Sequence, residues 1–211
     1  DMSDVFFRDL GMPKPAHHLD IGSGSHAEQT AGVMVAYEKL CLRERPDWTI
    51  VVGDVNSTMA ATLAAKKLLI PVAHLEAGLR SGDRAMPEEI NRIVTDSIAD
   101  VLWTPSVDGN ANLQREGIAP EKIERVGNIM IDAFEMQRTQ IEAAGMPAKM
   151  NLTPGGYAVV TIHRPANVDT REALGAVVEA LLAVAGRLPV VFPVHPRTRK
   201  QLETFGLFER L

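Results

Sequence analysis

The sequence contains very little cysteine and few aromatic residues. Cys41 is the single cysteine among 211 residues, and phenylalanine, tryptophan and tyrosine together make up 5% of the chain. One cysteine excludes a disulfide framework and a cysteine metal cluster within this chain, and it fits a reducing compartment. Apolar residues recur at helical spacing around Cys41, which predicts that its side chain packs in a core.

The sequence also lacks strongly charged and strongly apolar segments. The net charge is −5 and basic residues are spread along the chain, which argues against a surface for nucleic acids or anionic membranes. No apolar run approaches the roughly 20 residues of a membrane span, and the first residues do not resemble a signal peptide. The composition therefore predicts a cytoplasmic protein that binds neither nucleic acid nor membrane.

Strand and helix patterns alternate through the first part of the chain. Apolar runs that end at residues 53, 75, 103 and 126 are typical of strands buried in a parallel sheet. Helical patterns lie between and around them, at residues 25–45, 57–69, from Pro87 onward, 106–117 and from about 129. This rhythm predicts an α/β fold with parallel strands and right-handed crossovers.

A break in the periodicity over residues 146–156 predicts an interdomain linker, because prolines and paired glycines interrupt all patterns there. A second α/β unit is predicted after it, with strands at 157–162 and 189–194 and helices at 171–187 and from about 198. The chain opens without an obvious first strand and is expected to stop inside an amphipathic helix at Leu211. We therefore expect a central fragment with part of each sheet missing.

Two carboxylates directly follow predicted strands. Asp54 comes after the strand that ends at Gly53, and Glu76 after the strand that ends at Leu75. Ligands of open α/β sheets bind beyond the carboxyl ends of the strands. For Asp54, a helix cap is an equally good interpretation. A functional role is the better interpretation for Glu76, because a carboxylate at a buried strand end is costly without a partner.

The segment after Glu76 is rich in charge. It carries Arg80, Asp83, Arg84, Glu88 and Glu89. Acidic residues in a first helical turn complement the helix dipole, which is a purely structural explanation for the two glutamates. The alternative is a polar pocket with mobile cationic clamps, with one glutamate of the pair facing the pocket and the other facing solvent.

Histidines follow both strands of the second unit. His163 and Arg164 end the first strand, and they would meet substrate or phosphate if the two units face each other across a cleft. A histidine in this position is also often only a hydrogen-bonded cap. His195 and Arg197 hold the equivalent place on the next strand and carry a weaker signal, as does a possible phosphate loop at 22–25.

Four longer runs resemble the non-hydrolysing UDP-N-acetylglucosamine 2-epimerases. They are VVGDVNST (51–58), PVAHLEAGLRSGDRAMPEEINRIVTD (71–96), ERVGNIMIDA (124–133) and VTIHRPANVD (160–169). The resemblance implies two Rossmann-like domains in a glycosyltransferase-B architecture. Residues 1–150 would form the N-terminal domain without its first strand, and 151–211 the beginning of the UDP-binding domain. It further implies a homodimer of the full-length protein and no metal or other cofactor.

The resemblance also implies a reaction for cell-surface polysaccharide precursor synthesis. UDP-N-acetylglucosamine and UDP-N-acetylmannosamine would interconvert by anti elimination of UDP and its re-addition to 2-acetamidoglucal. The positions that match the family's catalytic residues are Asp54, Glu76, Glu88 and His163. Those assigned to substrate binding are Arg80, Arg84, Arg92, Arg164 and Asn167. Arg92 is also placed to hold one of the carboxylates charged by pairing.

The sequence departs from the family pattern in two places. His163–Asn167 reads His-Arg-Pro-Ala-Asn where the family often has His-Arg-Arg-Glu-Asn, so the substrate is also open to a UDP-2,3-diacetamido-glucuronic acid. The family's Gly-Thr-Arg-Pro-Glu loop and its Gly-rich UDP-gripping segment have no counterpart, so little activity is expected of this fragment alone. A glycosyltransferase of the same architecture and a catalytically silent nucleotide-sugar-binding module remain alternatives.

Overall fold

The computed structural model describes residue 7 and residues 10–211. The chain divides into two compact units between Arg138 and Thr139, and each unit is described by itself. The prediction that no strand opens the chain falls mostly on residues outside this description. Within the described residues, no helix is both long and apolar enough to cross a membrane.

The first unit is built on a four-stranded sheet whose strands are parallel, as predicted, and lie in the order β1-β2-β3-β4. The strands are β1 Thr49–Val52, β2 Val72–Leu75, β3 Val101–Thr104 and β4 Ile123–Arg125. In the register, Val51 pairs with His74, and Leu75 pairs with both Val52 and Trp103. All carboxyl ends therefore lie at one edge of the sheet.

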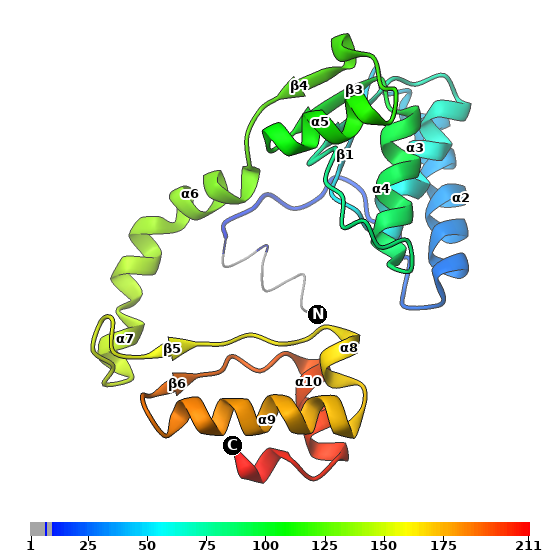
Figure 1. The fold of residues 1–211 in the computed structure, drawn as a ribbon. Helices are drawn as coiled ribbons and strands as arrows, with labels where there is room; N and C mark the ends of the chain where they lie inside the picture. Colours follow the sequence, from blue (N-terminus) through cyan, green and yellow to red (C-terminus); the bar gives the residue numbers. More distant parts are fainter. Residues whose placement is uncertain (1–6, 8–9) are drawn as a thin grey trace. The chain divides into compact units, whose positions relative to one another are not determined.

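In the described residues, the following helices and 3-10 turn belong to this unit, with α6 continuing past its end at Arg138. They are α2 His26–Glu44, α3 Asn56–Lys67, α4 Pro87–Ile98, α5 Val107–Arg115, η1 Pro120–Lys122 and α6 Ile129–Ala144. The predicted capping box of α2 is present, since Ser25 and Glu28 each accept the other's backbone N–H. Pro87 occupies the start of α4, as predicted. Helix α3 lies between α2 and α4 and contacts both (Figure 1).

The two faces of the sheet differ in burial. The core of the unit includes Val51, Val72 and Leu102, and the buried Cys41 confirms the predicted core role of that residue. In β1, however, Ile50 is 59% exposed and Val52 is 49% exposed. The prediction that β1 is buried on both faces is wrong, because alternate side chains of a strand point to opposite faces and only one face of β1 is packed.

The second unit has two short parallel strands, β5 Ala158–Val159 and β6 Val190–Val191. Its helices are α7 Met146–Lys149, α8 Pro165–Val168, α9 Arg171–Ala185, α10 Pro196–Thr204 and the 3-10 turn η2 Phe208–Arg210. Helix α9 packs into a core that includes Val168, Leu174 and Leu202. Helix α7 lies inside the segment predicted as a linker, and α8 was not predicted.

The last helix ends earlier than predicted. Helix α10 stops at Thr204, and the N–H groups of Gly206 and Leu207 donate back to the carbonyls of Glu203 and Leu202. This pair of bonds closes a helix when the residue after its cap takes positive φ, and Gly206 has φ +66°. The expectation that the chain stops inside a helix at Leu211 is therefore wrong.

Candidate functional site

The carboxyl ends of β1 and β2 bring two candidate acids to one edge of the sheet. Gly53 turns the chain after β1 with φ +69°, and its N–H donates to the carbonyl of Leu75 at 3.1 Å. A Cβ placed on Gly53 would lie 3.8 Å from Oε2 of Glu76. The Glu76 carboxylate therefore lies beside the turn that carries Asp54.

Asp54 is held by helix α4. Its carboxylate accepts a hydrogen bond from Nη2 of Arg92, and its carbonyl accepts one from Nδ2 of Asn91 at 2.8 Å. The N-cap of α3 is Val55, and no side-chain cap bond is found there in the described part of the chain. Asp54 is thus not a helix cap, whereas the predicted pairing of a candidate carboxylate with Arg92 is confirmed.

Glu76 has an unusual backbone conformation. Its φ is +74°, a region that residues other than glycine rarely adopt and that costs about 1–3 kcal/mol. The N–H groups of Glu76 and Ala77 both donate to the carbonyl of Trp103, at 3.1 and 3.0 Å. Such conformations concentrate at functional sites, where the direction of a side chain can outweigh the cost of backbone strain.

Burial separates the two glutamates at the start of α4. Glu89 is 2% exposed, and its carboxylate accepts the N–H groups of Ser81 and Gly82, both at 2.9 Å, and Nη1 of Arg92. Burial acts to raise the pKa of Glu89, but these three donors outweigh it and lower the pKa from 4.5 to about 2. Glu89 therefore orders the loop as an anion, while Glu88 is partly exposed.

The loop after β2 forms one wall of a cavity of about 320 Å³. The lining residues are Arg80, Gly82, Arg84, Glu89, Ile93, Asn112, Arg115 and Glu116. Arg84 is exposed, as a mobile cation would be. Arg80 is fixed instead, because its guanidinium bonds to Asp96 at 2.8 Å and to Glu116 at 2.6 Å. The prediction of a mobile clamp is wrong for Arg80.

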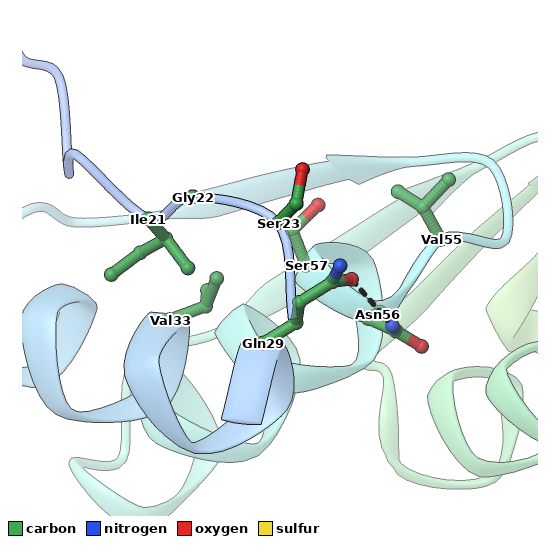
Figure 2. Close-up of a pocket in the computed structure, with 8 residues that line it drawn as sticks. All are labelled: Ile21, Gly22, Ser23, Gln29, Val33, Val55, Asn56 and Ser57. Carbon is green, nitrogen blue, oxygen red and sulfur yellow. Dashed lines mark hydrogen bonds between the residues drawn. The ribbon is translucent and has the colours of Figure 1, made fainter. Parts of the chain in front are cut away.

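A second cavity, of about 410 Å³, lies where the starts of α2 and α3 meet (Figure 2). It is lined by Ile21, Gly22, Ser23, Gln29, Val33, Val55, Asn56 and Ser57. Nδ2 of Asn56 donates to Oε1 of Gln29 at 2.9 Å and ties the two helices together. The possible phosphate loop at residues 22–25 thus borders a cavity, next to the turn that carries Asp54.

In the second unit, the structure brings His163 and His195 together. Both side chains are exposed, and their ring centroids are 5.2 Å apart. Nδ1 of His195 accepts the N–H of Arg197 and caps α10, so this histidine also has a structural role. The Arg197 guanidinium pairs with Asp169. Arg164 and Asn167, at the start of and within α8, are exposed.

In the first unit, two buried polar residues near the carboxyl edge of the sheet were not predicted. His74 in β2 and Asp96 in α4 are almost completely buried, and they hydrogen-bond to each other at 2.6 Å. A histidine inside the apolar run of residues 71–75 was the available signal.

Across the described ranges, no group of three or more His, Cys, Asp or Glu side chains is arranged to hold a metal ion.

Comparison with known proteins places this geometry in a family. The sequence profile described as UDP-N-acetylglucosamine 2-epimerase matches residues 1–211. The Methanocaldococcus jannaschii UDP-N-acetylglucosamine 2-epimerase is 43% identical over 217 residues, which cover 100% of this chain and 59% of that protein. The Pseudomonas aeruginosa UDP-2,3-diacetamido-2,3-dideoxy-D-glucuronate 2-epimerase is 42% identical over 212 residues, covering 98% of this chain and 58% of its own length.

Solved structures agree with the sequence comparisons. The M. jannaschii epimerase in complex with UDP-GlcNAc and UDP has a TM-score of 0.87 and 42% identity, covering 99% of this chain and 58% of that one. The Neisseria meningitidis UDP-GlcNAc 2-epimerase bound to UDP-GlcNAc has a TM-score of 0.86 and 28% identity, covering 97% and 58%. The chain therefore spans less than two thirds of the length of these relatives.

Proposed function

We propose a function for the whole protein from one established fact: this chain belongs to the UDP-N-acetylglucosamine 2-epimerase family. The proposed activity is an isomerase reaction that interconverts UDP-N-acetylglucosamine and UDP-N-acetylmannosamine. The observation that supports it is the placement of Asp54 and Glu76 at neighbouring strand ends of one sheet edge. Inversion at a sugar carbon needs groups that remove and return a proton, and carboxylates are suited to both steps.

The proposed chemistry has two halves. A carboxylate removes the C2 proton while UDP leaves C1 with the electrons of the C1–O bond, which forms 2-acetamidoglucal. A carboxylic acid then protonates C2 on the opposite face, and UDP adds back to C1. We assign these proton transfers to Asp54, Glu76 and Glu88 as a set. We do not assign any one of them to a particular face of the sugar at C2. Arg92 supports the set because it already pairs with Asp54.

Substrate-binding roles are proposed for residues of each unit, taken by itself. His163, Arg164 and Asn167 are exposed near the carboxyl end of β5, which suits contact with a diphosphate. Arg84 is the exposed cation of the loop in the first unit, and Arg80, although ion-paired, lines the same cavity. We propose that 1–150 and 151–211 are parts of two Rossmann-like domains of a cytoplasmic homodimer that supplies polysaccharide precursors.

Deuterium incorporation tests this proposal directly. The whole protein is incubated with UDP-N-acetylglucosamine in deuterated water, and the sugar is analysed by NMR and mass spectrometry. An epimerase places one deuterium at C2 and forms the manno epimer. A glycosyltransferase or a silent binding module leaves C2 unlabelled, and that result would refute the proposed activity.

The second candidate substrate is a UDP-2,3-diacetamido-glucuronic acid. The P. aeruginosa enzyme named for this substrate is 42% identical to the chain, almost the same as the 43% of the M. jannaschii relative. The two substrates differ at sugar carbons 3 and 6 and share the UDP group. Parallel assays of the whole protein with both sugars decide between them, because the true substrate has the higher kcat/KM.

Residues 1–211 alone are proposed to have little activity. The chain covers 58% of the relative whose structure holds UDP-GlcNAc and UDP. A ligand held by a whole two-domain protein loses affinity when part of its contacts is absent. The same deuterium assay, run on residues 1–211 and on the whole protein at equal concentration, tests this expectation; equal rates would contradict it.

A further inference from the structure

His74 lies in the middle of β2 with no exposed surface, and both of its ring nitrogens face acceptors. Nε2 is 2.9 Å from the carbonyl oxygen of Gly53, which only accepts hydrogen bonds, so Nε2 carries a proton. Nδ1 is 2.6 Å from Oδ1 of Asp96. This short contact also requires a proton between its two atoms.

The surroundings of Asp96 indicate where that second proton resides. Its Oδ2 accepts the N–H of Gly78 at 3.1 Å and forms an ion pair with Nη1 of Arg80 at 2.8 Å. A hydrogen bond and a guanidinium on one oxygen favour an ionised carboxylate, which leaves both protons on the His74 ring. Arg80 also pairs with Glu116, so the cluster has one cation and two anions before the His74 ring is counted, and a protonated ring supplies the second cation. Because the charges balance, a buried imidazolium is compensated here.

We propose that His74 is a positioning residue of the epimerase site. Its ring is an imidazolium, and the hydrogen bonds of this ring connect the two strand ends that carry Asp54 and Glu76. The positioning role in an epimerase site rests on the proposed function. The charge on the ring rests on the hydrogen bonds alone. No contact of His74 with substrate is required.

The bonds run from one candidate acid to the other. Gly53 directly precedes Asp54, and its carbonyl is held by Nε2 of His74. Through Asp96, the same ring holds the N–H of Gly78, two residues after Glu76. A ring with one proton would leave either the Gly53 carbonyl without this donor or the bare Nδ1 lone pair 2.6 Å from Oδ1 of Asp96, and both arrangements are costly in a buried site. The doubly protonated ring therefore fixes the spacing of the two acids.

The loop held in this way has little freedom to adjust. The carbonyl of Gly78 accepts Nδ2 of Asn112 at 2.9 Å, and a Cβ on Gly78 would come within 2.5 Å of the carbonyl oxygen of Gly109. Glu76 itself keeps its positive φ between these anchors. A small shift at His74 is therefore transmitted to the Glu76 carboxylate rather than absorbed.

The charge is tested by NMR of the whole protein labelled with ¹⁵N-histidine, at about pH 8, which is above the ordinary titration range of histidine. The His74 signals are assigned by their loss in His74→Gln, or in His74→Asn if that variant does not fold. We expect protons on both ring nitrogens, with slow exchange. The exposed His18, which has its own carboxylate partner in Asp20 at 2.9 Å, is the matched control. A singly protonated His74 ring would overturn the proposal.

The positioning role is tested by kinetics of the whole protein. We expect His74→Gln and Asp96→Asn each to lower kcat about 10–100-fold, with KM changed less than about threefold, because a displacement of reacting groups costs rate rather than binding. The double variant should be little worse than either single one, since the two side chains act as a unit. His18→Gln should match the wild type, and circular dichroism confirms that each variant is folded.

Other results separate the possible failures. An unchanged kcat, or a raised KM at constant kcat, in a folded His74→Gln would refute the positioning role. Additive losses in the double variant would refute the link through Asp96. If the wild-type protein places no deuterium at C2 of either UDP-sugar, the proposed function fails, while the NMR spectrum still decides the charge on His74 by itself.

Discussion

Arg92 on helix α4 donates a hydrogen bond to the carboxylate of Asp54, 38 residues earlier in the chain. Its other terminal nitrogen donates to Glu89 at 2.9 Å. One guanidinium thus connects a candidate catalytic acid with the anion that orders the loop after β2. Arginine suits this place because its planar fork serves two carboxylates at once, and lysine offers only a point charge.

Arg92→Lys tests that connection. We expect the free energy of unfolding of the chain to fall by about 1–2 kcal/mol, less than for a fully buried pair because the Arg92 and Asp54 side chains are 16% and 31% exposed. In the whole protein, epimerisation should fall as well, since Asp54 loses its anchor. Urea unfolding measures the first effect and the deuterium assay the second. Arg138→Lys, on a more exposed pair with Glu135, is the control for stability.

Glu76→Gln separates an enzyme from a silent binding module. The amide is close in size to the carboxylate but cannot exchange a proton, so we expect deuterium incorporation by the whole protein to fall by about 10²–10⁴-fold with the fold retained. Glu121→Gln is the matched control. Glu121 is exposed in η1, which directly precedes β4, so it lies at the amino end of a strand and not at the carboxyl end where Glu76 lies. Equal rates in the wild type and in Glu76→Gln would remove Glu76 from the catalytic set.

Glu89 gives the stability of the chain a defined pH dependence. Its folded pKa of about 2 lies below the ordinary 4.5, so the ionised group stabilises the fold above pH 4.5 and this contribution is lost as the pH falls toward 2. The contribution is on the order of 3 kcal/mol. We expect the difference in unfolding free energy between wild type and Glu89→Gln to be largest near neutral pH and to shrink through this window. A difference that stays constant down to pH 2 would contradict the assignment.

Two glycines of the same loop provide a matched comparison. Gly78 and Gly82 have φ values of +79° and +74°, but a Cβ on Gly82 meets nothing within 4 Å, whereas one on Gly78 meets the carbonyl oxygen of Gly109 at 2.5 Å. Gly82→Ala should therefore cost only the backbone strain of about 1–2 kcal/mol. Gly78→Ala should cost about 2–5 kcal/mol, because overpacking adds to the strain. Thermal unfolding of both variants measures the difference; equal losses would show that the close contact is relieved easily.

Much of the local structure was predictable because it depends on neighbours in the sequence. Ser25 and Glu28 cap α2 across a single turn, and Pro87 opens α4 with a backbone angle that proline already favours. The early end of α10 also has a local signal, because glycine is the usual residue beyond a helix cap and Gly206 holds that place; the prediction of a longer helix is wrong for this reason. The position of Asp54 and Glu76 at one edge followed from the rule for parallel sheets.

The partners of the charged side chains were not predictable in the same way. Arg80 was expected to be mobile, yet it pairs with Asp96 and with Glu116, 36 residues away. For Glu88 and Glu89, the prediction was only that one faces a pocket and the other faces solvent. The bonds of Glu89 to the backbone of the loop depend on how that loop folds back over α4. Periodicity shows which side of a helix is polar, but it does not show which distant group each polar atom meets.

The alternation of strands and helices, the family, and the acids that follow β1 and β2 could all be predicted without coordinates, because they depend on patterns within a few residues and on motifs read in order. Folding had to be known to see which charged groups are paired and which are exposed, and to see that His74 lies between Gly53 and Asp96. A buried polar group bonds to whichever partner packing brings to it. That partner lies 21 or 22 residues away for His74, beyond the reach of any local pattern.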